Sequence, residues 1–148
     1  MPSENNGLFL LSKTNVFFLN MIKITRILLI AFLFITSINA LISGLLFILD
    51  PSGNLMGMTT DYLKASPFTS FLIPGIVLFT VNGIMNLVAG ISLIKRKPYA
   101  SSLAILQGML LIGWIIIQVL IVKDINMLHI SMLAIGVSFV LGGWIYDK

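Results

Sequence analysis

The sequence contains no cysteine and carries little charge. Without cysteine the chain has no disulfide, no thiolate metal site and no thiol redox centre. Only 9% of the 148 residues are charged, whereas soluble domains carry about 25%. The net charge of +4 comes from basic residues that flank apolar runs and form no basic stripe, so we expect no nucleic-acid partner. No residue set amounts to a catalytic or transport motif, and we expect no cofactor.

Apolar residues make up 58% of the chain, and its mean hydropathy is +1.08. A soluble domain of this length leaves much of its surface wet and has no way to bury so much apolar area. We therefore predict an all-α fold, a membrane-embedded antiparallel four-helix bundle. The expected spans are about 27–49, 68–94, 99–122 and 126–146 within a domain of residues 23–148.

The first span is uncharged over its 23 residues, which gives a helix of about 35 Å for a hydrocarbon core of about 30 Å. It is too long for the apolar part of a signal peptide, and Ile38 before Ala40 makes a poor cleavage context. Residues 1–22 are expected to form an N-terminal tail, with an interfacial helix as one alternative. In a second alternative, Met21 is the natural start.

Lysine and arginine favour the cytoplasmic side of a membrane. Four spans place seven basic residues on one side and only two, Lys64 and Lys123, on the other. We therefore expect a multi-pass protein of the cytoplasmic (inner) membrane with both termini in the cytoplasm.

The segment 50–75 lies between the first two spans and holds three of the five prolines. It combines turn residues with an apolar cluster, so we predict a structured extracytoplasmic loop. This loop either caps the bundle or forms a docking surface for a lipid or a partner protein.

Two sets of polar residues are candidate sites. The first is an outer-face cluster of Asp50, Asp61, Asp124 and His129. One histidine with carboxylates is able to bind a metal or to act as an acid–base set. The alternative is that His129 bonds to the loop, Asp50 ends a helix and Asp61 is exposed.

The second set is an intramembrane polar face of five amides: Asn39, Asn82, Asn86, Gln107 and Gln118. These amides either bond to one another across the helices or line a polar cavity for a ligand or ion. No Asp, Glu, Lys or Arg is expected at mid-membrane depth, which argues against a proton-coupled carrier.

The loop contains the patterns D-P-S-G-x-x-M-G-M and Y-L-x-x-S-P-F-x-x-F-L-I-P-G. In these it resembles small, uncharacterised four-helix membrane proteins of bacteria, over roughly residues 26–146. The layout is also loosely similar to that of DoxX-type four-helix proteins. The resemblance implies a bacterial inner-membrane protein and supplies no activity and no site residue.

Three functions remain open from the sequence. The leading hypothesis is a small non-enzymatic accessory or structural membrane protein. The alternatives are a channel or carrier subunit for a small neutral or weakly polar solute, and a lipid-modifying enzyme that uses the outer-face Asp and His residues. Membrane lipids are the expected partners, together with another membrane protein or a second copy of the chain. Interlocked amides would favour the first function, and a polar cavity the second.

Overall fold

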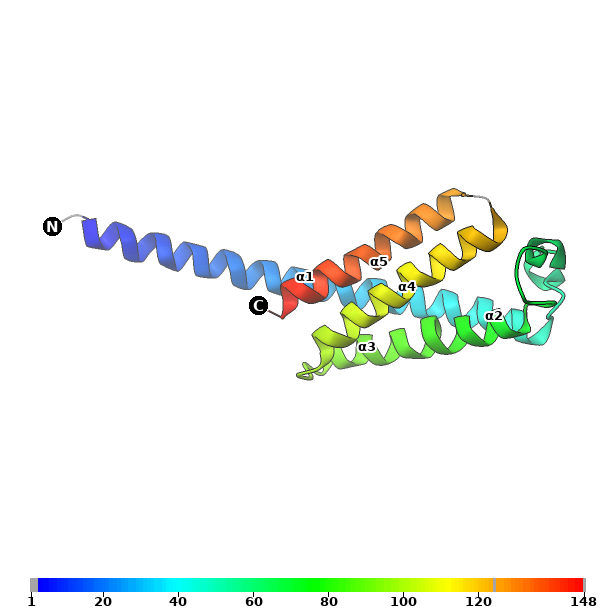
Figure 1. The fold of residues 1–148 in the computed structure, drawn as a ribbon. Helices are drawn as coiled ribbons and strands as arrows, with labels where there is room; N and C mark the ends of the chain where they lie inside the picture. Colours follow the sequence, from blue (N-terminus) through cyan, green and yellow to red (C-terminus); the bar gives the residue numbers. More distant parts are fainter. Residues whose placement is uncertain (1–2, 124, 148) are drawn as a thin grey trace.

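The computed structural model describes residues 3–123 and 125–147, with side chains from residue 13 onward, and is helical without any strand in these ranges. The elements in chain order are α1 (Ser3–Leu49), η1 (Asn54–Met56), η2 (Thr60–Leu63), α2 (Leu72–Val77), η3 (Leu78–Ile84), α3 (Met85–Ile94), α4 (Ala100–Val122) and α5 (Met127–Tyr146). Since α2, η3 and α3 follow one another without a break, they form one rod (Figure 1). The prediction of an all-α four-helix bundle is confirmed.

The four rods close a ring in which α1 contacts α3 and α5, and α4 contacts the same two helices. Consecutive rods run in opposite directions (Figure 1). Four helical segments of the described chain are long and apolar enough to cross a membrane. They are Lys13–Leu49, Leu72–Ile94, Ala100–Val122 and Met127–Tyr146.

The second rod begins at Leu72, four residues after the expected start. The chain before it is held in turns, because the Ser66 hydroxyl accepts a hydrogen bond from the Phe68 N–H at 3.1 Å. Farther along, the Phe71 N–H donates to the Pro51 carbonyl at 2.8 Å. These bonds fold residues 64–71 back onto the end of α1 and delay the helix.

Helix α1 is longer than the predicted first span. The stretch Lys13–Leu49 has 37 residues and is about 55 Å long, well beyond a hydrocarbon core of about 30 Å. The helix runs without interruption through the expected tail boundary at residue 22. Its N-terminal part projects beyond the other helices (Figure 1).

Arg26 marks the level at which α1 enters the bundle. Its Nε donates to the Leu93 carbonyl at 3.0 Å, and its Nη2 donates to the Ile94 carbonyl at 3.2 Å. The last carbonyls of a helix have no partner within the helix, so this guanidinium caps the C-terminus of α3.

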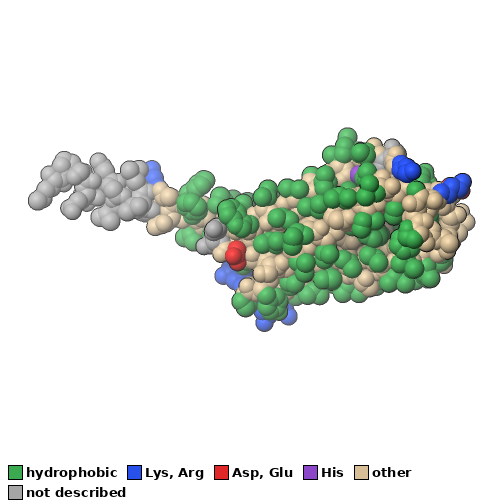
Figure 2. Space-filling view, in the orientation of Figure 1, with side chains coloured by type: hydrophobic (Ala, Val, Ile, Leu, Met, Phe, Trp, Pro, Cys, Tyr) green, Lys and Arg blue, Asp and Glu red, His purple; other side chains and the backbone are tan. Residues whose placement is uncertain are grey.

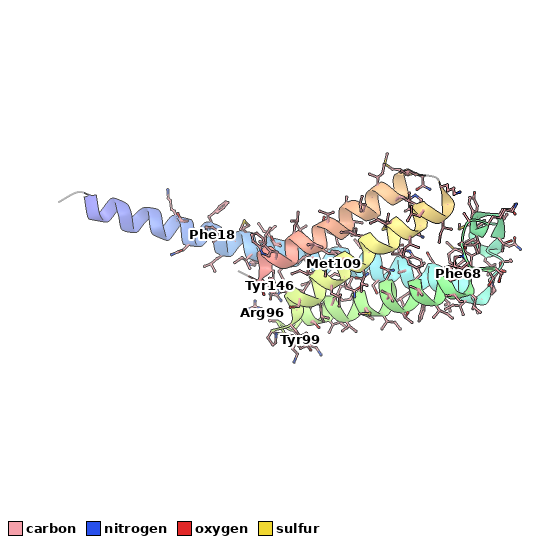
Figure 3. The ribbon with its side chains drawn as sticks, in the orientation of Figure 1. Phe18, Phe68, Arg96, Tyr99, Met109 and Tyr146 are labelled. Atoms are coloured by element: carbon pink, nitrogen blue, oxygen red, sulfur yellow. The ribbon has the colours of Figure 1, made fainter. Side chains whose placement is uncertain are left out.

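The bundle has two chemically different ends. We call the end with Arg26 and residues 95–97 the basic end, and the end with residues 50–71 and the α4–α5 turn the loop end. Figure 3 labels Arg96, Tyr99 and Tyr146 at the basic end and Phe68 at the loop end. On the face shown in Figure 2, charged side chains gather toward the ends, and apolar side chains cover the body between them.

Close backbone contacts hold neighbouring helices together. A Cβ on Gly44 of α1 would lie 2.6 Å from the backbone nitrogen of Phe79, and one on Gly108 of α4 would lie 2.6 Å from the carbonyl oxygen of Gly136 in α5. Small residues that allow such contacts are the main means by which helices associate in lipid.

Two apolar clusters lie at different heights. The larger one fills the basic half of the bundle and includes Leu33, Leu93 and Phe139, each with no exposed surface. The smaller one lies at the loop end, where Phe47 and Phe71 stack with ring centroids 4.8 Å apart. It shows that the loop between the first two spans is structured, as predicted.

Candidate functional site: a cavity at the loop end

A cavity of about 520 Å³ lies inside the loop half of the bundle. Its wall is built by α1, α2, η3, α4, α5 and the loop, and most of the lining residues are apolar. Among them are Phe47, Met56, Met58, Tyr62, Leu63, Phe68, Phe71, Leu78, Trp114, Ile115, Ile121, Leu128 and Met132. This volume and lining are typical of a small-molecule site.

The inner limit of the cavity, its floor, lies well inside the bundle. Thr36 of α1, Asn82 of η3 and Leu111 of α4 line it there. Asn82 follows the start of α2 by ten residues, which corresponds to a depth of about 15 Å. The cavity therefore reaches about half the thickness of a hydrocarbon core of about 30 Å.

The floor carries polar atoms without partners. Thr36 and Asn82 are only 4% and 1% exposed. Within the described chain, the Thr36 hydroxyl and both atoms of the Asn82 carboxamide make no hydrogen bond. A buried polar group without a partner costs about 1–3 kcal/mol, so these atoms destabilise the fold.

A π-helical turn, η3, positions Asn82. The Thr80 hydroxyl donates to the Ile76 carbonyl at 2.7 Å, and the Ser37 hydroxyl of α1 donates to the Gly83 carbonyl at 2.8 Å. Asn86 adds a bond from its Nδ2 to the Asn82 carbonyl at 2.7 Å. These bonds satisfy backbone carbonyls around the turn and leave the Asn82 side chain unpaired. π-Turns inside helices frequently occur at functional sites.

The five predicted intramembrane amides divide into two groups. Asn39, Asn82 and Gln118 line the cavity, and Asn39 is an exposed part of its wall. Asn86 lies one turn from Asn82 toward the basic end, and Gln107 lies one turn from Leu111 in the same direction. Both side chains are buried, and neither lines the cavity. Asn82 and Gln107 make no side-chain hydrogen bond to any described residue, so these two do not take part in the interlocked amide network considered from the sequence.

His129 also lines the cavity, near its outer end. Asn126 caps α5, because its Oδ1 accepts hydrogen bonds from the N–H groups of Leu128 at 3.0 Å and His129 at 3.3 Å. In return, the His129 Nδ1 accepts from the Asn126 N–H at 3.3 Å. An accepting Nδ1 assigns the proton of a neutral ring to Nε2. His129 is thus bonded to the turn before α5.

The aspartates of the outer-face cluster have other partners. Asp50 accepts hydrogen bonds from the Ser52 hydroxyl, the Ser52 N–H at 3.2 Å and the Leu55 N–H at 2.9 Å. These hydrogen bonds hold the pKa of the Asp50 carboxyl below its ordinary value of 3.8, and the bond from the Ser52 hydroxyl contributes most. Asp61 pairs with Lys64 at 3.0 Å on the exposed surface.

The predicted cluster is therefore not assembled among the residues that can be described. Asp124 lies outside them. The side chains that the structure describes include no group of three His, Cys, Asp or Glu able to hold a metal. Asp50 and Asp61 are absent from the cavity lining, whereas His129 belongs to it.

Thr36 and Asn126 line the cavity but were not among the candidate site residues predicted from the sequence. Thr36 belongs to the stripe Thr36, Asn39, Ala40 and Ser43 with helical spacing, all of which line the cavity. Asn126 is the N-cap of α5, and the signal for it is the spacing of three residues to His129. The π-turn had no signal in the sequence that we recognised.

Comparison with known proteins gives no further assignment. The chain matches no family model, no curated protein and no solved structure. The resemblance of its loop to that of uncharacterised four-helix proteins stays a prediction.

Proposed function

We propose that this chain is a small non-enzymatic protein of the cytoplasmic membrane that binds a neutral or weakly polar solute in the loop-end cavity. The observation that carries the proposal is the cavity of about 520 Å³ itself, which is mostly apolar and is lined by a few polar side chains, among them Gln118 and His129. A volume and lining of this kind are typical of small-molecule sites.

The proposed orientation has the basic end and both termini in the cytoplasm. Residues 95–97 and Arg26 lie at one end, against Lys64 and Lys123 at the other, which agrees with the preference of cations for the cytoplasmic side. The cavity would then face the extracytoplasmic half of the membrane. A lipid-modifying enzyme is a weaker proposal, because the described members of its candidate acid–base set bond elsewhere.

A channel or carrier role would require more than the cavity. The apolar cluster with Leu33, Leu93 and Phe139 closes the bundle on the basic side of the cavity floor. Transport would need a second conformation in which these side chains separate. We therefore propose solute binding, rather than transport by this chain alone, as the function.

Native mass spectrometry of the full chain, purified from its own membranes in mild detergent, tests this proposal. We expect a bound neutral molecule at a ratio of one per chain. Ala40 lines the cavity and is 5% exposed, so Ala40→Phe should fill part of the space and remove the adduct. Ala134→Phe is the matched control, because Ala134 is exposed on α5. A chain without an adduct, or an adduct that survives Ala40→Phe, would refute solute binding.

A further inference from the structure

An exposed face of α1 carries a regular row of side chains, which we call the α1 seam. Positions separated alternately by three and four residues recur along it. Its exposed members alongside the bundle are Leu28, Phe32, Ile35, Asn39, Ile42 and Leu49. This is the spacing with which two helices pack along each other in a coiled coil. The seam therefore has the periodicity that a second helix requires.

Asn39 distinguishes the seam from an ordinary lipid-facing surface. It lies about 20 Å along α1 from Arg26 and about 15 Å from Leu49, close to the middle of a spanning helix. None of the hydrogen bonds of the described chain involves its carboxamide. Although Asn39 borders the cavity, Ile35 and Ile42 on either side of it are exposed and lie outside the lining. Acyl chains offer this amide neither a donor nor an acceptor, so a surface of lipid leaves it unsatisfied.

A second copy of Asn39 supplies the missing partner. A carboxamide has two N–H donors and one carbonyl acceptor, so two such groups related by a two-fold axis can donate to each other. Both copies carry the same charges at the basic end and insert in the same direction. Their α1 helices are then parallel, and equal residues face each other across the axis. A single asparagine in an apolar seam also fixes the register of the pair.

The projecting part of α1 supports the same partner. Phe18 and Met21 continue the spacing of the seam beyond Arg26, and Figure 3 labels Phe18 on this projection. Phe18 is 52% exposed and Phe17 beside it is 67% exposed. A second α1 alongside would cover these aromatic rings. Arg26 and Lys23 fall outside the spacing of the seam, so the paired helices do not place like charges against each other.

We propose that two copies of this chain pair in parallel along the α1 seam, with the two Asn39 carboxamides hydrogen-bonded to each other inside the membrane. The pairing extends from the loop end to Phe18 in the projecting part. It does not depend on solute binding in the cavity.

Disulfide cross-linking in the membrane tests the pairing, because the full chain has no cysteine of its own. A disulfide requires the two Cα atoms to lie within about 7 Å. Ile42→Cys should give a cross-linked dimer after mild oxidation, and Phe18→Cys should do the same in the projecting part. Ile116→Cys on α4 is the matched control and should stay monomeric. Ile116 and Ile42 are 51% and 56% exposed, and both lie about 24 Å along their helices from the basic end.

Dilution in lipid vesicles measures the contribution of Asn39. Energy transfer between donor-labelled and acceptor-labelled copies, each labelled at Thr59→Cys in the exposed loop, gives the dissociation constant of the dimer. Asn39→Leu should raise this constant about tenfold, because leucine has a similar size and cannot form the hydrogen bonds. Gln118→Leu is the control, since it removes an amide of the cavity wall that lies outside the seam. It should leave the constant unchanged.

Monomers at every ratio of protein to lipid would overturn the inference, and lipid would then be what covers the seam. Equal cross-linking of Ile42→Cys and Ile116→Cys would overturn it too, because contact would then not be specific to α1. Cross-linking at Ile42 without cross-linking at Phe18 would refute the pairing of the projecting parts. An unchanged dissociation constant in Asn39→Leu would refute the amide pair. All four results leave solute binding intact, which Ala40→Phe tests separately.

Discussion

Gly108→Ala should weaken the pairing of α4 with α5. The new Cβ would lie 2.6 Å from the Gly136 carbonyl oxygen, 2.7 Å from Val140 Cγ2 and 2.8 Å from the Val140 nitrogen. Two of these atoms belong to the backbone and have no rotamer by which to move away. The shortest contact is about 0.8 Å inside the 3.4 Å at which ordinary van der Waals contact begins, so the helices must separate and lose dispersion along their length. Overpacking of this kind costs about 1–3 kcal/mol.

Gly113→Ala is the matched control on the same helix. A Cβ at Gly113 would meet no atom within 4 Å, and alanine favours a helix over glycine by about 1 kcal/mol. The free energy of unfolding is measured by far-UV circular dichroism during titration of mixed micelles with SDS. We expect a loss for Gly108→Ala and no loss, or a small gain, for Gly113→Ala. Equal stability of Gly108→Ala and Gly113→Ala would refute the close contact between α4 and α5, because both variants share the helix preference of alanine.

Three further changes test the ends of the helices. Arg26→Lys keeps the charge but loses the two-pronged cap on α3, and should lower the free energy of unfolding in the same titration by about 1 kcal/mol; an unchanged value would show that the cap is dispensable. Asn126→Ala removes the N-cap of α5, and should cost about 1 kcal/mol and speed amide hydrogen exchange at residues 128 and 129; unchanged exchange would contradict the capping box. Hydrogen bonds lower the pKa of Asp50 in the folded state, so the stability that they add is complete above pH 3.8 and is lost as the pH falls through the folded-state pKa. The ¹³C chemical shift of the Asp50 carboxyl should titrate with a midpoint below 3.8, and a midpoint at or above 3.8 would disprove the turn geometry.

The arrangement of spans was accessible from the sequence because it depends on composition. Uncharged apolar runs bounded by Lys, Asp and Pro leave few alternatives to crossing helices. The start of the second rod was misplaced because Ser66 and Pro67 have the pattern of a helix N-terminus. In the structure, the Ser66 hydroxyl bonds within a turn instead. Local pattern does not reveal that the Phe71 N–H reaches back to Pro51.

The candidate site was accessible only in part. Helical spacing identified the faces that carry Asn39, Asn82 and Gln118, and all three line the cavity. The cavity itself is lined by segments far apart in the sequence, from α1 through the loop to α5, so it is a property of tertiary packing. The outer-face aspartates were grouped because the predicted topology places them at the same end of the bundle. In the structure, Asp50 instead accepts hydrogen bonds from the N–H groups of its own turn.

Thiol reactivity in the cavity wall tests the central claim most directly. The chain has no cysteine, so Leu78→Cys and Ala89→Cys each introduce a single thiol in the same rod. Leu78 is half-buried and lines the cavity, whereas Ala89 is fully buried in the apolar cluster of the basic half. With methyl methanethiosulfonate in lipid vesicles, we predict rapid modification of the Leu78→Cys variant and very slow modification of the Ala89→Cys variant. Equally slow reaction of the two thiols would contradict a cavity at the loop end.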